Sequence, residues 1–207
     1  MRRVVKVGGS LLLQSKLAES LREWIAGQPA AQTLVIFGGG ELIEAIRRLD
    51  QLRPGDPGEV HWRCVELLQA TFDIASSWLV DWPRIDTTGD FDEALAAITS
   101  GSPATLVSVR SFYRRDSGSQ LRRDPGDSGS QLPGDSGSQL PLNWSTTTDS
   151  IAAELAVKVG ADELVLLKSC DVDPEADALQ LARKGIVDPV FPRVAGKLPA
   201  FRVERLC

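Results

Sequence analysis

The sequence predicts an α/β protein in which a mostly parallel β-sheet lies between two layers of helices, a three-layer α/β/α sandwich. Short apolar runs alternate with longer segments of helical periodicity along most of the chain. This alternation is typical of proteins whose crossover helices cover both faces of a parallel sheet. With 207 residues, 43% of them hydrophobic, the chain suits one domain with a substantial core. We therefore expect a single domain over residues 1–207.

The expected strands are the short apolar runs. They are Val4–Val7, Leu34–Phe37, Ala104–Val109 and Leu164–Leu167, with a further strand-like run at Phe201–Leu206. In a sheet with helices on both faces, ligands bind at the carboxyl ends of the strands. The residues that follow each run are therefore candidates for a ligand site.

Helical periodicity fills the segments between these runs. The expected helices are Leu11–Ala26, Glu41–Leu52, His61–Trp78, Phe91–Thr99 and Ser150–Val159. Capping residues mark two of the helix starts. Asp90 is the expected N-cap of the Phe91 run, with Glu93 three residues later. Thr147 or Asp149 is the expected N-cap of the last helix.

One segment departs from the α/β pattern. The hexamer DSGSQL occurs at residues 116–121, 127–132 and 135–140, and the last two copies belong to a tandem PGDSGSQL unit. The repeat has no apolar periodicity, and its composition cannot bury enough surface to offset the entropy of ordering. We expect residues 116–141 to be a disordered surface insertion. A lid over the site is the functional alternative, and we favour passive duplication.

Charge and cysteine content exclude several classes of protein. The net charge is −5 and the isoelectric point is about 5.0, so nucleic acid is not the expected partner. No apolar run reaches the roughly 18 residues of a membrane span, and no membrane partner is expected. Cys64, Cys170 and Cys207 are odd in number, lack metal-binding spacing and accompany no secretory signal. These features predict a soluble, cytoplasmic protein.

Two glycine-rich turns stand where a strand-like run gives way to a helix-like run. They are Lys6–Ser10, KVGGS, and Phe37–Glu41, FGGGE. Glycine lets backbone N–H groups approach an anion at the start of a helix, so both turns are candidate phosphate sites. Two such turns suggest the donor and acceptor of one reaction, with Lys6 as the mobile positive charge. The structural alternatives are a solvated lysine at a strand end and a simple strand-to-helix turn.

Two further motifs follow in order, T-x-D-S-x-A-A at Thr147–Ala153 and L-L-K-x-x-x-V at Leu166–Val172. Together with the glycine turns, they resemble the amino acid kinase superfamily, which contains acetylglutamate, uridylate and isopentenyl phosphate kinases. The pair at 61–62 and the stretches Trp144–Ala153 and Gly185–Pro189 are most similar to one branch. That branch phosphorylates (5-aminomethylfuran-3-yl)methyl phosphate to its diphosphate in methanofuran biosynthesis. The resemblance implies an amino acid kinase-like fold and a homo-oligomer.

The resemblance also implies roles on the donor side, with ATP and Mg²⁺ as cofactors. Lys6 would hold the transferring phosphoryl group, and Lys168 would be a second cation on the nucleotide phosphates. Gly8, Gly9 and Ser10 would donate hydrogen bonds to the ATP phosphates. Mg²⁺ would arrive with ATP, so no metal site built from protein residues is expected.

On the acceptor side, the resemblance implies a small-molecule phosphate as substrate. The residues expected to bind it are Gly38, Gly39, Gly40, His61, Trp144 and Asp73. His61 donates two hydrogen bonds when protonated, although a packed amphipathic pair with its tryptophan neighbour is the alternative. Asp73 would pair with the amine of the furan substrate. Asp149 would orient the lysines and the glycine turns rather than act as a base, because a phosphate acceptor already carries its nucleophilic oxygen.

Two departures from the superfamily pattern keep other functions open. Val172–Glu175 reads VDPE where many relatives have V-D-G-V-Y, and only Gly196-Lys197 remains of a glycine-rich segment near the C-terminus. One alternative is a kinase with another acceptor, of the acetylglutamate, UMP or isopentenyl phosphate type. The other is a nucleotide-binding sensor without turnover, because a fold does not fix a function.

Overall fold

A single parallel sheet organises the molecule. The structure is a computed structural model that describes residues 1–86, 89, 91–98, 102–115 and 140–207. Within these residues, six strands pair in the order β3-β4-β2-β1-β5-β6, and every pairing is parallel. The strands are β1 Arg2–Val7, β2 Gln32–Phe37, β3 Arg84–Ile85, β4 Thr105–Val107, β5 Glu163–Lys168 and β6 Phe201–Arg205.

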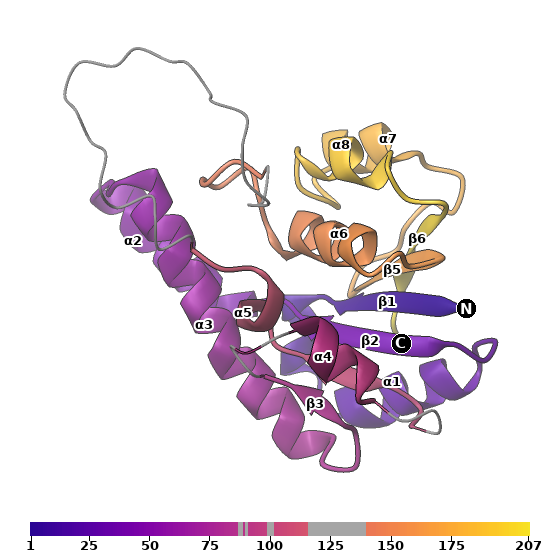
Figure 1. Ribbon diagram of the computed structural model, residues 1–207. Helices are drawn as coiled ribbons and strands as arrows, with labels where there is room; N and C mark the ends of the chain where they lie inside the picture. The colour runs from indigo at the N-terminus through magenta and orange to yellow at the C-terminus, as the bar shows by residue number, and fades with distance from the viewer. Residues whose placement is uncertain (87–88, 90, 99–101, 116–139) are drawn as a thin grey trace.

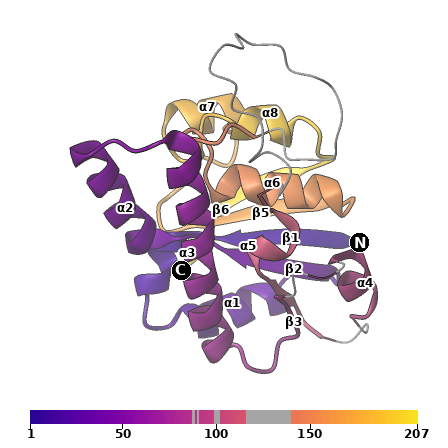
Figure 2. The same cartoon turned by 60° about the vertical axis from the view of Figure 1, so that its left-hand side comes forward.

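Helices cover both faces of this sheet, which confirms the expected three-layer α/β/α class. They are α1 Leu17–Ala26, α2 Gly40–Leu52, α3 Pro57–Trp78, α4 Phe91–Ala96, α5 Val109–Phe112, α6 Thr148–Lys158, α7 Ala178–Arg183 and α8 Phe191–Ala195, with a 3-10 helix η1 at Gly9–Leu13. Figure 1 shows α6, α7 and α8 on one face of the sheet and α1 on the other. Long α3 extends from one layer to the other beyond the end of the sheet (Figure 2).

The core consists of two clusters, one on each face of the sheet. The α6-side cluster contains buried residues of α6 and α8 and the first half of α3, whereas the α1-side cluster contains η1, α1 and the second half of α3. Alternate residues of a strand point to opposite faces. In β1, Val4 belongs to the α6-side cluster, and Val5 and Val7 belong to the α1-side cluster. Lys6 therefore points to the α6 side of the sheet.

Several helix boundaries differ from the sequence prediction. The segment expected as one helix from Leu11 to Ala26 divides into η1 and α1. Helix α3 begins at Pro57 rather than at His61, because Asp56 is the N-cap and accepts a hydrogen bond from the Glu59 amide at 3.0 Å. Thr147 is the N-cap of α6, and its hydroxyl accepts from the amide of residue 149.

The expected strand Ala104–Val109 was too long. Strand β4 ends at Val107, and Val109 begins α5. Strand β3 and helices α5, α7 and α8 were not predicted. Within the described part of the chain, no helix is both long and apolar enough to cross a membrane.

Some sequence predictions fall where the structure gives no description. Asp90, Thr99 and residues 116–139 of the expected insertion lie outside the described residues. The last two residues assigned to the insertion are described. One of them, Leu140, is buried in the α6-side cluster, so the expectation of a disordered surface residue is wrong at this position.

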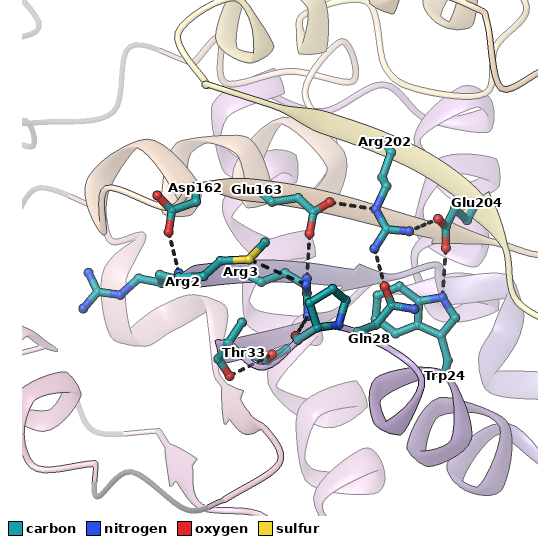
Figure 3. Close-up of polar contacts among 12 residues, drawn as sticks. Arg2, Arg3, Trp24, Gln28, Thr33, Asp162, Glu163, Arg202 and Glu204 are labelled. Carbon is teal, nitrogen blue, oxygen red and sulfur yellow. Dashed lines mark hydrogen bonds and ion pairs between the residues drawn. The ribbon is translucent and has the colours of Figure 1, made fainter.

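An ion-pair network ties the strands together at their amino ends. Glu163 on β5 accepts hydrogen bonds from Arg3 on β1 at 2.6 Å and from Arg202 on β6 at 2.8 Å (Figure 3). Arg202 also lies over the ring of Trp24, whose indole N–H donates to Glu204 at 2.8 Å. Burial by itself would raise the pKa of Glu163, but the two arginines hold that pKa below its ordinary value. Because the network lies at the amino ends of the strands, it does not occupy the carboxyl ends, where a site is expected.

Candidate active site

The strand register brings two lysines to the same face of the sheet. Leu164 and Leu166 of β5 belong to the α6-side cluster, so Lys168 points to that side as Lys6 does. Strands β1 and β5 are neighbours, and Lys6 pairs with Leu166 in the register. Both ammonium groups therefore reach the carboxyl end of the sheet beneath the start of α6.

Asp149 joins these two lysines. It lies in the first turn of α6 and is only 4% exposed. One carboxylate oxygen, Oδ1, is 2.9 Å from the Lys6 Nζ, and the other, Oδ2, is 2.7 Å from the Lys168 Nζ. The structure thus assembles all three residues that the sequence suggested as catalytic.

The charges of this triad leave a surplus that suits an anion. Burial alone would raise the pKa of Asp149, but the charges of Lys6 and Lys168 hold it below its ordinary value, so the carboxylate is ionised at neutral pH. Burial and then the charge of Lys6 lower the pKa of Lys168, while Asp149 opposes both effects. With all three groups ionised, the triad carries one net positive charge in a water-poor environment.

The two glycine turns touch each other above the triad. A Cβ atom on Gly9 would lie 2.0 Å from the Gly40 amide nitrogen, and Gly40 has a φ of +54° that disfavours other residues. Gly39 is the N-cap of α2, so the first amides of α2 have no partner within that helix. Close backbone approach and open amides are what a phosphate site requires.

Two of the predicted glycines have another role. The amide of Gly8 donates to the Leu167 carbonyl oxygen at 2.8 Å, and the amide of Gly38 donates to the Val7 carbonyl oxygen at 2.9 Å. These N–H groups are occupied and cannot donate to phosphate. A Cβ on Gly38 would lie 3.2 Å from Cε of Lys6, so this glycine makes room for the lysine instead.

A cavity of about 270 Å³ opens beside the turns, between α2, α3 and the segment that leads into α6. Of the predicted site residues, Lys6, Gly9, Ser10, Gly39, Gly40, His61 and Trp144 line it. Its body is mostly apolar, with Ile43, Val60, Cys64, Val65, Leu68 and Ile151 in the wall. The cavity therefore has a polar end at Lys6 and the glycine turns, and an apolar body.

Asp73 does not reach this cavity. Its side chain is exposed and accepts a hydrogen bond from Gln69 at 2.8 Å. It follows His61 by twelve residues on α3, which places it about 18 Å farther along the helix axis. The carboxylates that do line the cavity are Glu41 and Glu44 on α2.

His61 differs from its predicted role as a doubly protonated phosphate ligand. Its Nε2 atom lies 3.0 Å from the Tyr113 hydroxyl, and its imidazole also makes a hydrogen bond with the backbone of Asn143. Burial lowers the pKa of His61, so the ring is neutral at neutral pH. His61 thus joins two chain segments and presents an aromatic surface to the cavity.

Arg47 is a site residue that the sequence analysis missed. Its guanidinium lies 4.5 Å from the centre of the Trp144 ring, and the Trp144 indole N–H donates to Asp50 at 2.7 Å. The Arg47 Nε atom is buried and makes no hydrogen bond within the described residues, although Glu44 Oε1 is 3.3 Å away. Helical spacing is the sequence feature that points to Arg47. It follows Gly40 by seven residues, so both residues lie on the same face of α2.

Comparisons with known proteins establish the fold. No family model and no curated protein matches this sequence. Among solved structures, a uridylate kinase from Archaeoglobus fulgidus aligns over 99% of this chain and 91% of its own, with a TM-score of 0.57 and 15% identity. A UMP kinase from Ureaplasma parvum aligns over 100% and 90%, with a TM-score of 0.59 and 13% identity.

An aspartate kinase from Synechocystis gives a TM-score of 0.64 and 14% identity, and the match covers 99% of this chain but 38% of that one. The chain has the amino acid kinase fold. At these identities the similarity shows the fold alone, and the function must be argued from the site.

Proposed function

We propose that this chain is an ATP-dependent kinase that transfers the γ-phosphoryl group of ATP to a small phosphomonoester. The observation that carries this proposal is the buried Asp149, which bridges Lys6 and Lys168 beside two touching glycine turns. Phosphoryl transfer depends mainly on positioning and on neutralising charge, and a triad with one surplus positive charge supplies both. The fold shared with uridylate, UMP and aspartate kinases agrees with this chemistry.

Each group of the triad has a distinct part in the reaction. An oxygen of the acceptor phosphate bonds to the γ-phosphorus while the bond from that phosphorus to the β,γ-bridging oxygen breaks, and ADP leaves. Lys6 lies between the two turns and stabilises the charge on the transferring group. Lys168 neutralises negative charge on the phosphates of ATP, the phosphoryl donor. Asp149 keeps both ammonium groups in place and takes no proton, because the acceptor oxygen is already ionised.

Mg²⁺ would be held through the phosphates of ATP. Both oxygens of Asp149 are engaged by lysines, which leaves no free carboxylate at the triad. No group of three or more His, Cys, Asp or Glu side chains in the described regions could hold a metal ion. Bound in this way, Mg²⁺ would neutralise charge on the β- and γ-phosphates.

The best candidate for the acceptor is (5-aminomethylfuran-3-yl)methyl phosphate. Its phosphate suits the end of the cavity formed by Lys6 and Gly40, and its furan ring suits the apolar body. With Asp73 outside the cavity, we assign Glu44 as the partner for the amine. Glu44 lines the cavity one turn beyond Gly40 on α2.

A panel of acceptors tests the proposal. Purified protein is incubated with Mg-ATP and one of the furan phosphate, UMP, isopentenyl phosphate, acetylglutamate or carbamate, and ADP release is measured. We expect release above background with the furan phosphate, and its abolition in Lys6→Ala. Turnover with another acceptor would identify that substrate instead. ATP binding by calorimetry without release for any acceptor would overturn the kinase proposal and support a nucleotide sensor.

A further inference from the structure

A second buried carboxylate, Asp188, lies behind the triad. Asp188 is 5% exposed and precedes α8. It accepts hydrogen bonds from the first turns of both α6 and α8. Oδ2 accepts from the Thr147 amide at 3.0 Å, the Thr147 hydroxyl at 2.8 Å and the Ser150 amide at 3.1 Å. Oδ1 accepts from the Ser150 hydroxyl and from the amides of Val190 at 3.0 Å and Phe191 at 2.9 Å.

These bonds hold the residues on either side of Asp149. Thr147 and Ser150 flank it in the sequence, and both bind Asp188 through backbone and side chain. The Thr147 hydroxyl that donates to Asp188 also accepts from the Asp149 amide at 3.3 Å. A chain of hydrogen bonds thus runs from Asp188 through Thr147 to the backbone of Asp149.

The carboxylate of Asp149 depends on this support. Its Oδ1 and Oδ2 atoms meet Lys6 and Lys168, which end long flexible side chains. The position of its backbone therefore decides where the two ammonium groups converge. A displacement of about 1 Å in such a group can lower a reaction rate by about 100-fold.

We propose that Asp188 is a positioning residue for phosphoryl transfer, which fixes the start of α6 so that Asp149 holds Lys6 and Lys168 together. This inference rests on the proposed function. Asp188 is not among the residues that line the cavity, so it acts through Asp149 and not on the substrate. The ionised form is required, because all six of its bonds are accepted ones.

The charge of Asp188 also reaches Lys168. It raises the pKa of Lys168 and so opposes the lowering caused by burial and by Lys6. This link provides a readout that does not depend on turnover and that a helix cap far from Lys168 would not change.

The first test is a double-mutant cycle with Asp188→Asn and Asp149→Asn. The amide of Asp188→Asn would face N–H or O–H donors, so we expect kcat to fall by about 10- to 100-fold with little change in the KM for ATP. If Asp188 acts through Asp149, the double variant will be no slower than Asp149→Asn alone. The proposal would be overturned if the two losses of kcat multiplied in the double variant. It would also be overturned if the loss of kcat in Asp188→Asn were no larger than the fraction of that variant that is unfolded.

Asp177→Asn is the matched control. Asp177 caps α7, and its side chain accepts from the Gln180 amide at 2.8 Å, so the same substitution alters a helix cap outside the cavity. We expect its kcat to equal that of the wild type. If Asp188→Asn does not fold, Thr147→Val removes the hydroxyl that donates to Asp188 and accepts from the Asp149 amide, and it should reproduce a smaller loss of kcat. An unchanged kcat in Thr147→Val would then count against the proposal.

A titration without substrate separates this inference from the proposed function. NMR of protein labelled with ¹³C-lysine follows the Lys168 signal, which is assigned by its loss in Lys168→Met. We expect Lys168 to titrate at lower pH in Asp188→Asn and at an unchanged pH in Asp177→Asn. An unchanged Lys168 titration in Asp188→Asn would refute the positioning role even if the wild type transfers no phosphoryl group.

Discussion

Some side chains of the cavity wall can bind a charged group of a ligand, whereas others determine the shape of the cavity. Arg47 belongs to the first kind, because its guanidinium lies over Trp144 and its buried Nε atom, 3.3 Å from Glu44 Oε1, makes no hydrogen bond in the described protein. A buried N–H group without a hydrogen-bond acceptor lowers the stability of the folded protein unless a ligand or a water molecule supplies that acceptor. An acceptor molecule in the cavity would supply that partner.

We expect Arg47→Ala to raise the KM for the acceptor by about tenfold, the loss of one charged hydrogen bond, with kcat little changed. Arg48→Ala is the control, because Arg48 is the next residue on α2, is 67% exposed and pairs with Glu41 without lining the cavity. Steady-state kinetics on both variants checks this. An equal rise in both would mean that the net charge of α2, and not Arg47, governs acceptor binding.

His61 makes the stability of the protein sensitive to mild acid. Burial lowers its pKa in the folded state, so the unfolded chain takes up the proton more readily. Its contribution to stability is therefore complete above about pH 6.5, the unfolded pKa, and is lost as the pH falls toward the folded pKa. The chain has one histidine, which makes the effect assignable.

Urea unfolding of the wild type and of His61→Gln at pH 7.5 and pH 5.5 tests this expectation. The free energy of unfolding should fall more on acidification in the wild type than in the variant. The same fall in both proteins would show that carboxylates alone govern acid stability here.

At the scale of elements, the ion pairs at the amino ends of β1, β5 and β6 fix the sheet. Arg3 is 2% exposed, and Glu163 is its anionic partner. We expect Glu163→Ala to lower the free energy of unfolding by about 3 kcal/mol, because it leaves a buried guanidinium unpaired. Asp81→Ala, which breaks the exposed pair with Arg22, should lower the free energy of unfolding much less. Chemical denaturation measures both, and equal losses would contradict a structural role for the network.

The elements that could be predicted from sequence were those long enough to show a period or buried enough to contain a run of apolar residues. Strands β1, β2 and β5 each contain such a run, because helices cover both of their faces. Strand β3 has two residues and α8 has five, too few for either signal. Helix α7 is the exception among these short elements, because a capping box at Asp177 and Gln180 marks its start in the sequence.

The candidate site was predictable to the extent that it follows from strand ends. Lys6 and Lys168 could be placed because each lies near the carboxyl end of a strand, and Asp149 because it opens a helix. Asp188 could not be placed, because its partners belong to a segment 38 residues earlier that only the fold brings near. Asp73 was misplaced because the sequence does not show which part of a long helix faces a cavity.

At the scale of the whole molecule, the sheet puts two glycine turns on adjacent strands, and α6 places a carboxylate above them. Strands β1 and β2 are neighbours, so the turn after β1 and the turn after β2 must meet. In the proposed reaction, the donor and acceptor sides would therefore share one wall. This geometry follows from strand order, and it explains why distant sequence motifs converge on one triad.

Phosphorus-31 NMR of Mg-ATP mixed with (5-aminomethylfuran-3-yl)methyl phosphate tests the central claim, transfer at the Asp149 triad, most directly. With wild-type protein we predict that the phosphomonoester signal will be replaced by two coupled signals of a diphosphate, along with those of ADP. With Asp149→Asn the rate should fall by about 100-fold or more. A diphosphate formed equally fast by Asp149→Asn, or no phosphoryl transfer from ATP to any acceptor of the panel, would contradict it.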